Sequence, residues 1–185
     1  MPRPGAVAPV TSTGYAAAME PWNSNLDLGV AEADQVHRAL YDLTALAEEA
    51  MQRGDPAGVK VHLDRLHAAS VEHFAREEAQ MADSAYPGAK AHREAHAAFM
   101  AEFGKINAEL AARGLSPLFR LWFGSRFIDW LRFHIRGVDV QFYRHWRQFQ
   151  EEQAKAAEAA LVAAAKAGAP APADAAEPPG APAKR

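Results

Sequence analysis

The chain contains 185 residues, 49% of them hydrophobic, and its formal net charge is −3. This length suits one hydrophobic core, and the small net charge gives no reason to expect a nucleic-acid partner. The chain contains no cysteine, which excludes disulfides, thiolate metal sites, iron–sulfur clusters and cysteine nucleophiles. Any metal would therefore be held by imidazole and carboxylate groups.

The sequence also lacks the usual signals for membrane insertion or export. No run of about 18 apolar residues is present, as a membrane-spanning helix would need. Prolines interrupt the first residues, which have no continuous apolar region of the kind that a signal peptide contains. We therefore expect a cytoplasmic protein without a membrane span.

Composition divides the chain into four parts. Residues 1–20 are rich in Pro, Ala, Gly and Thr without periodicity, which is typical of a flexible arm. Residues 21–153 carry the apolar periodicity of a helical bundle. Residues 154–167 predict an Ala-rich helical extension, and residues 168–185 predict a disordered Ala/Pro-rich tail.

Within the second part, apolar residues at helical spacing predict four helices. Three cover about residues 31–53, 57–83 and 88–113, and the fourth begins near Ser116-Pro117, where Ser is a good N-cap and Pro suits the first turn. Four helices of roughly 20 to 30 residues with short turns predict an all-α, antiparallel, up-down-up-down four-helix bundle with flexible N- and C-terminal tails.

The fourth predicted helix has two contrasting sides. One side is apolar and aromatic, as expected of a face that packs in the core. The other side carries an arginine stripe, which consists of Arg126, Arg132, Arg136, Arg144 and Arg147. This stripe fits either a partner surface or a solvated outer face, and charged residues opposite an apolar face favour the solvated interpretation.

Donor groups for a metal are concentrated around the turn between the second and third helices. His73 and Glu77 are four residues apart, as are His92 and His96, so each pair points to one side of its helix. The turn at residues 86–88 should fold the third helix back beside the second. The two pairs then face each other inside the bundle, which predicts a metal site.

The inward faces of all four predicted helices contribute to this site. The five inward histidines are His37, His73, His92, His96 and His134, and the two accompanying carboxylates are Glu77 and Asp139. A single histidine on an apolar stripe is more often a hydrogen-bonded core residue than a ligand. Burying five without a metal would carry a heavy desolvation cost. Seven donors exceed the needs of a structural zinc or a mononuclear oxygenase site, so they suit two metal ions.

One spacing does not fit a regular helix. His134 and Asp139 are five residues apart, which places them about 140° from each other around an ideal α-helix. Either side-chain reach or a π-bulge near Gly137 can reconcile their directions. His62 and His145 also lie on inward stripes, but each is eleven residues from a candidate ligand, so we expect both to be structural.

Taken in order, the motifs of residues 22–149 resemble the hemerythrin family, most closely its bacterial single-domain members, the bacteriohemerythrins. The resemblance rests on Trp22, the Asp34-Gln35-Val36-His37 stretch, His73-x3-Glu77, Tyr86-Pro87 before His92-x3-His96, and Trp130-Leu131-x2-His134-Ile135-x3-Asp139. Each motif alone is weakly specific, whereas the ordered set with these spacings is highly specific.

The resemblance implies two iron ions (Fe2+/Fe3+) bridged by two carboxylates and an oxo or hydroxo group. One iron would be held by His92, His96 and His134, the other by His37 and His73, with Glu77 and Asp139 as the bridging carboxylates. The second iron then has one coordination place open for dioxygen. Apolar packing must keep water out of this oxygen pocket, for which Phe74, Trp130, Leu131 and Ile135 are placed.

The function that the resemblance implies is reversible dioxygen binding for storage, delivery or supply control, without catalysis. An oxygen or redox sensor that signals to a partner is an alternative. A di-iron oxidase or peroxidase is a further one, disfavoured because the chain has no Glu-x-x-His motif and offers five imidazoles to two carboxylates. The expected partners are dioxygen and either an oxygen-consuming enzyme or a signalling protein, with no nucleic acid.

Overall fold

The computed structural model describes residues 22–167, and all regular structure in this range is helical. The four long segments are α1 (Ala31–Gln52), α2 (Pro56–Asp83), α3 (Ala89–Arg113) and a fourth run from Pro117 to Lys166. A short 3-10 helix, η1 (Ser24–Leu26), precedes α1. The predictions for residues 1–20 and 168–185 lie outside the described residues.

The fourth run is divided where the backbone changes its helical pitch. Its elements are α4 (Pro117–Leu121), the π-helix η2 (Trp122–Phe127), α5 (Ile128–Phe133), the π-helix η3 (His134–Asp139) and α6 (Val140–Lys166). The predicted helix bounds are confirmed to within a residue or two at the ends of α1, α2 and α3. The two π-helices were not predicted as such, although a π-bulge near Gly137 was one of the two alternatives.

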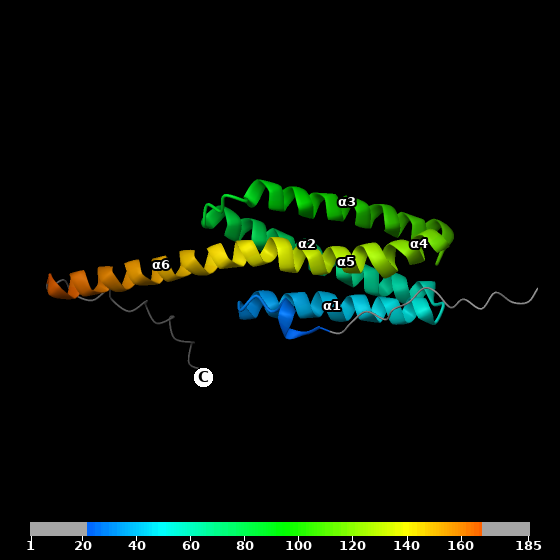
Figure 1. The fold of residues 1–185 in the computed structure, drawn as a ribbon, viewed down its shortest axis with the longest axis horizontal. Helices are drawn as coiled ribbons and strands as arrows, with labels where there is room; N and C mark the ends of the chain where they lie inside the picture. Colours follow the sequence, from blue (N-terminus) through cyan, green and yellow to red (C-terminus); the bar gives the residue numbers. More distant parts are fainter. Residues whose placement is uncertain (1–21, 168–185) are drawn as a thin grey trace, which may run out of the picture. The chain divides into compact units, whose positions relative to one another are not determined.

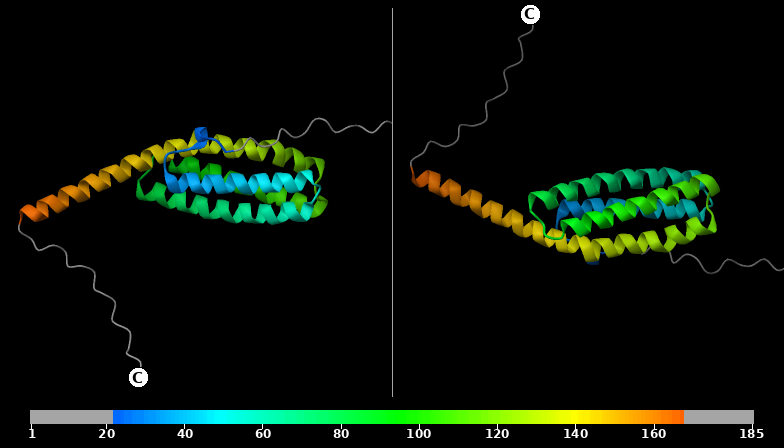
Figure 2. Two further views of the ribbon diagram at one scale, coloured as in Figure 1. Left: turned by 90° about the horizontal axis from the view of Figure 1, so that it is seen from below. Right: turned by 90° about the horizontal axis from the view of Figure 1, so that it is seen from above.

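The helices α1, α2, α3 and the α4–α5 run lie side by side with their axes roughly aligned (Figures 1 and 2). Consecutive helices run in opposite directions, because short turns join them at alternate ends of the bundle. The predicted antiparallel four-helix bundle is therefore confirmed. Its core is one continuous cluster of buried aliphatic and aromatic side chains drawn from all four segments.

Local capping explains where the helices begin. The Asp55 side chain accepts a hydrogen bond of 2.9 Å from the Gly58 backbone N–H, and Pro56 occupies the first turn of α2. Gly54, with a φ of +71°, supplies the left-handed residue that the α1–α2 turn requires. The α1–α2 connection therefore follows from three adjacent residues.

The segment before α1 is attached to the bundle by a buried carboxylate. Asp34 accepts hydrogen bonds from the backbone N–H groups of Leu28 (2.6 Å) and Gly29 (3.1 Å). Trp22 donates its indole N–H to Asp27 at 3.0 Å, and its ring lies 6.5 Å from that of His37. The lead-in is therefore packed over the first candidate ligand.

The chain divides into two compact units, Met1–Trp146 and Arg147–Arg185. In the second unit the described residues are 147–167, of which 147–166 belong to α6, and every one from residue 150 onward is exposed. The predicted boundary between a bundle ending at residue 153 and an extension starting at 154 stays a prediction. Among the described residues, none of the helices is long and apolar enough to cross a membrane.

Four of the five residues of the arginine stripe are exposed, and the fifth, Arg132, is not. Arg132 is half-buried, and its Nε donates a hydrogen bond of 2.8 Å to the hydroxyl of Tyr41 on α1. The interpretation of this residue as part of a solvated outer face was therefore wrong. Its guanidinium instead joins α5 to α1 beside the core, because the buried Tyr41 hydroxyl needs a polar partner.

Candidate metal centre

All four segments of the bundle place donor side chains at its centre. α1 provides His37, α2 provides His73 and Glu77, α3 provides His92 and His96, and η3 provides His134 and Asp139. All seven side chains are buried, and those of Glu77 and Asp139 are completely inaccessible to solvent. The structure thus brings together every donor that the sequence predicted.

The π-helix η3 resolves the spacing that a regular helix could not accommodate. It spans residues 134–139, so the two donors stand at its first and last positions. A π-helix bonds residue i to residue i+5, which places such residues one above the other on the same side of the helix. His134 Nε2 and Asp139 Oδ1 consequently lie 3.1 Å apart. Of the two alternatives, the π-bulge is the one found.

The seven donors form two groups, and each group's ligand atoms lie within 4.8 Å of one another. The larger group comprises Glu77, His92, His96, His134 and Asp139, and the smaller comprises His37, His73, Glu77 and Asp139. Both carboxylates belong to both groups. The three imidazoles of the larger group point their Nε2 atoms at one spot, with 3.1 and 3.2 Å from His134 Nε2 to those of His96 and His92.

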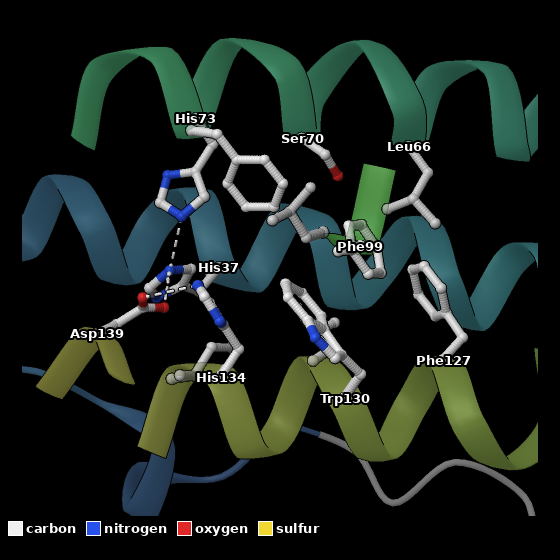
Figure 3. A pocket seen from close by; sticks show the side chains of 13 residues that line it. His37, Leu66, Ser70, His73, Phe99, Phe127, Trp130, His134 and Asp139 are labelled. Carbon is white, nitrogen blue, oxygen red and sulfur yellow. Dashed lines mark hydrogen bonds and ion pairs between the residues drawn. The ribbon is translucent and has the colours of Figure 1, made fainter. Parts of the chain in front are cut away.

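Each carboxylate divides its two oxygens between the groups. In Glu77, Oε1 lies 3.7 Å from His73 Nε2, whereas Oε2 lies 3.3 Å from His96 Nε2. In Asp139, Oδ2 lies 3.3 Å from His37 Nε2, whereas Oδ1 lies 3.1 Å from His92 Nε2. Figure 3 shows His37, His73 and His134 converging on Asp139. This is the arrangement expected of carboxylates that bridge two cations.

The polar atoms at this centre lack other partners. All four carboxylate oxygens of Glu77 and Asp139 are buried without a hydrogen bond of regular geometry among the described residues, and their nearest polar neighbours include the imidazoles of the same centre. The Nε2 atoms of His37 and His73 face each other at 3.0 Å. Burying a neutral polar group without a hydrogen bond costs about 2–7 kcal/mol, and burying an unpaired charge costs more. Two coordinated cations would satisfy all of these atoms, so the donor set fits metal ions.

Electrostatics keep two of the donors, His73 and Asp139, in the forms that bind metal. Burial lowers the pKa of His73 from its ordinary 6.5 to about 4, so its imidazole is neutral at neutral pH. Burial alone would raise the pKa of Asp139, but the imidazoles of His134, His37 and His92 lower it well below its usual range. The result is a neutral imidazole beside an ionised carboxylate, as metal coordination requires.

The His96 imidazole is also oriented through its Nδ1 atom, on the side of the ring away from the centre. The His96 Nδ1 atom lies 3.1 Å from Glu78 Oε1, and the Phe74 ring stacks on the His96 ring with centroids 3.9 Å apart. A carboxylate at Nδ1 fixes the ring tautomer, which leaves Nε2 as an acceptor directed at the centre. Phe74 and Glu78 are four residues apart on α2, so one helical face holds this ring.

A small cavity of about 10 Å³ adjoins the smaller group. His37 and His73, the two histidines of the smaller group, line it, whereas His134 is the one histidine of the larger group that does so. The four residues expected to form an oxygen pocket, Phe74, Trp130, Leu131 and Ile135, all line it, together with Leu40, Leu66, Ser70, Phe99, Phe127 and Asp139. The space beside the centre therefore lies on the side that has fewer donors.

Comparison with known proteins agrees with this geometry. The family described as "Hemerythrin HHE cation binding domain" matches residues 28–146, which is more than half of the chain. The chain belongs to the hemerythrin family. The match covers the bundle and every donor of the two groups.

Individual members of the hemerythrin family are similar along most of their length. The bacteriohemerythrin of Stenotrophomonas maltophilia is 30% identical over 139 residues, covering 71% of this chain and 86% of that protein. The myohemerythrin of Riftia pachyptila is 28% identical over 121 residues, covering 65% and 88%. A crystal structure of a point mutant of another protein superposes with a TM-score of 0.62 at 24% identity, covering 70% of this chain and 98% of that one, and supports the fold.

The two other inward histidines, His62 and His145, are outside both donor groups, as their distance along the helix from the candidate ligands led us to expect. His145 is half-buried, and its Nε2 donates a hydrogen bond of 2.9 Å to the Ser84 carbonyl at the end of α2. His62 is also half-buried, on α2. His145 therefore has a structural contact, in line with its distance along the helix from the candidate ligands.

Three residues, Glu78, Ser70 and Tyr143, lie beside the centre although the sequence did not identify them as part of its surroundings. By sequence alone, Glu78 is only a surface neighbour of Glu77, and Ser70 is only a core position. Tyr143 is buried on α6, its ring centroid 6.4 Å from that of His37. Burial, then the charges of Glu77 and Asp139, raise the pKa of Tyr143, which keeps it a neutral phenol. Its position four residues after Asp139 was the available signal, since such residues share a helical face.

Proposed function

We propose that this chain binds dioxygen reversibly at two iron ions held by His37, His73, Glu77, His92, His96, His134 and Asp139. Three imidazoles would hold one iron, two imidazoles the other, and Glu77 and Asp139 would bridge them. The observation that carries the proposal is the division of each carboxylate between the two donor groups. A mononuclear site has no use for two carboxylates shared in this way.

Iron suits a centre rich in imidazole with a few carboxylates, and the chain has no cysteine to favour softer metals. When bound, two ferrous ions supply the electrons that dioxygen takes up on binding and returns on release. The protein's part is to hold the two sites at fixed spacing and to leave one place free. The smaller group has four donors where the larger has five, and the cavity adjoins it.

The cavity walls supply the second requirement of reversible binding, which is the exclusion of water and protons. Leu131 and Ile135 are 5% and 0% exposed, and Phe74 covers the opposite side from α2. A cavity near 10 Å³ is at the lower limit for holding one water molecule. These side chains therefore keep the space beside the smaller group small and apolar, which suits a carrier better than an oxidase.

The test is the visible spectrum of the reduced, iron-loaded chain in air and again after oxygen is removed. A charge-transfer band that appears and then disappears supports reversible binding, whereas irreversible bleaching with substrate turnover would indicate an oxidase. Iron analysis should give about two ions per chain. His73→Gln should lower this ratio, and His145→Gln, which changes a histidine outside both groups, should not.

A further inference from the structure

The cavity beside the candidate centre contains one hydroxyl group, which the proposed iron sites do not use. Ser70 lies on α2, three residues before His73, and is 3% exposed. It lines the same cavity as His37, His73 and Leu131. Figure 3 shows its hydroxyl directed from α2 toward the interior of the bundle.

This hydroxyl has no hydrogen-bond partner within residues 22–167, unlike comparable groups in the bundle. The Thr44 hydroxyl donates back to the Leu40 carbonyl at 2.7 Å, and the Ser84 hydroxyl donates back to the Gln80 carbonyl at 2.8 Å. Such bonds to residue i−4 are the ordinary way in which a helical serine or threonine satisfies itself. The Ser70 hydroxyl makes no such bond, and because the residue is 3% exposed and lines the cavity, a ligand in that cavity would supply the partner that it lacks.

The surroundings of Ser70 make it a selective donor. Apart from the candidate ligands and the Trp130 indole, the other lining side chains are aliphatic or phenyl groups. A small ligand in this cavity can therefore accept a hydrogen bond from very few groups. Ser70 is three residues from His73, about 4.5 Å along the helix axis, so it stands beside the smaller donor group but is displaced from it.

We propose that Ser70 determines ligand specificity in this cavity by donating a hydrogen bond to the outer atom of a small bound ligand. The inference rests on the proposed function, because the inner atom of the ligand would occupy the free place at the smaller group. The favoured ligands have two or three atoms and a lone pair on the outer one, as dioxygen and azide do. A single-atom ligand such as fluoride has no outer atom and gains nothing from Ser70.

The experiment compares azide and fluoride binding to the oxidised, iron-loaded protein by visible absorption. Ser70→Ala should raise the azide dissociation constant about three- to tenfold, the range expected for one neutral hydrogen bond. The fluoride dissociation constant should not change. Ser84→Ala makes the same chemical change outside the cavity and should leave both constants at their wild-type values.

A second measurement needs no metal. Because the Ser70 hydroxyl is unpaired in the bundle, the metal-free Ser70→Ala protein should melt at the wild-type temperature or higher. Ser84→Ala should melt at a lower temperature, because it loses the bond to the Gln80 carbonyl. A clear decrease for Ser70→Ala would mean that its hydroxyl is bonded within the protein, and the inference would be wrong.

The outcomes separate this inference from the function on which it rests. If wild-type protein binds azide but Ser70→Ala binds it equally tightly, the role of Ser70 is refuted and the proposed centre stands. Equal losses of azide and fluoride affinity would also refute it, since the effect would not depend on an outer atom. If the iron-loaded wild-type protein binds neither anion, the free place does not exist, and both proposals fail.

Discussion

Replacing Leu131 by alanine tests whether the cavity wall protects bound dioxygen. Leu131 is 5% exposed, lines the cavity, and lies three residues before His134, one turn along the same inward side. The cavity of about 10 Å³ is now at the threshold for one water molecule. Removing the leucine side chain beyond its Cβ extends this space with room for additional water. We expect water and protons to reach the centre, so that bound dioxygen is lost irreversibly and the irons stay oxidised.

The cost in stability follows from the burial of this side chain. Leucine-to-alanine changes in packed cores destabilise by about 2 to 5 kcal/mol, with the larger values where a cavity persists. For a chain of this size, each kcal/mol lowers the melting temperature by about 2 to 4 °C. We therefore expect a decrease of about 4 to 20 °C, and oxidation rates must be compared well below the melting temperature of the variant.

Leu63→Ala is the matched control, because Leu63 is completely buried on α2 but does not line the cavity. Both variants should lose similar stability and keep their iron, as measured by thermal unfolding and metal analysis. The decay of the oxygenated spectrum should accelerate only in Leu131→Ala. Equal decay rates in the two variants would show that general loosening of the core causes the oxidation, and the protective role of Leu131 would be refuted.

Three further experiments test the centre and its surroundings. Glu78→Gln should lower the affinity for iron about tenfold, because His96 loses the carboxylate that orients it; competition with a chelator measures this affinity. The control Glu94→Gln, on the exposed side of α3, should leave the affinity unchanged. The metal-free protein should lose stability as the pH falls from 6.5 toward 4, because the pKa of His73 is about 4 in the folded state, so the unfolded state takes up the proton first. Urea unfolding at several pH values measures this, and a free energy of unfolding that stays constant across this window would contradict the lowered pKa. A chain shortened to residues 19–160 should keep full iron content and its oxygen spectrum, and loss of either would show that the predicted bundle boundaries are wrong.

The sequence was most informative where a feature depends on periodicity alone. The helical repeat of apolar residues predicted α1, α2 and α3 because each buries one continuous face. The same repeat placed His37, His73 and His92 on inward faces, and the structure brings them together. Spacing along a helix fixes the direction of a side chain, so these features needed no tertiary information.

Other features depend on contacts between helices, which spacing cannot specify. Whether Glu78 points to solvent or to His96 depends on how α2 faces α3, so its role was not visible in the sequence. The missing hydrogen bond of Ser70 is likewise a property of side-chain rotation within a packed core. The division of the Glu77 oxygens between His73 and His96 requires α2 and α3 at their final distance.

The π-helix η3 also shifts the phase of the sequence relative to the bundle. Compared with an α-helix, its wider turn accommodates one additional residue, so the apolar repeat before His134 and the repeat after Asp139 are out of step by one position. Deleting Gly137 would restore a single uninterrupted repeat, and His134 and the carboxylate would then be four residues apart, a spacing that shares one face of an α-helix, so Phe142 and its neighbours at the start of α6 would keep their direction relative to α5. The π-helix therefore takes up one additional residue without changing which faces of α5 and α6 point into the bundle.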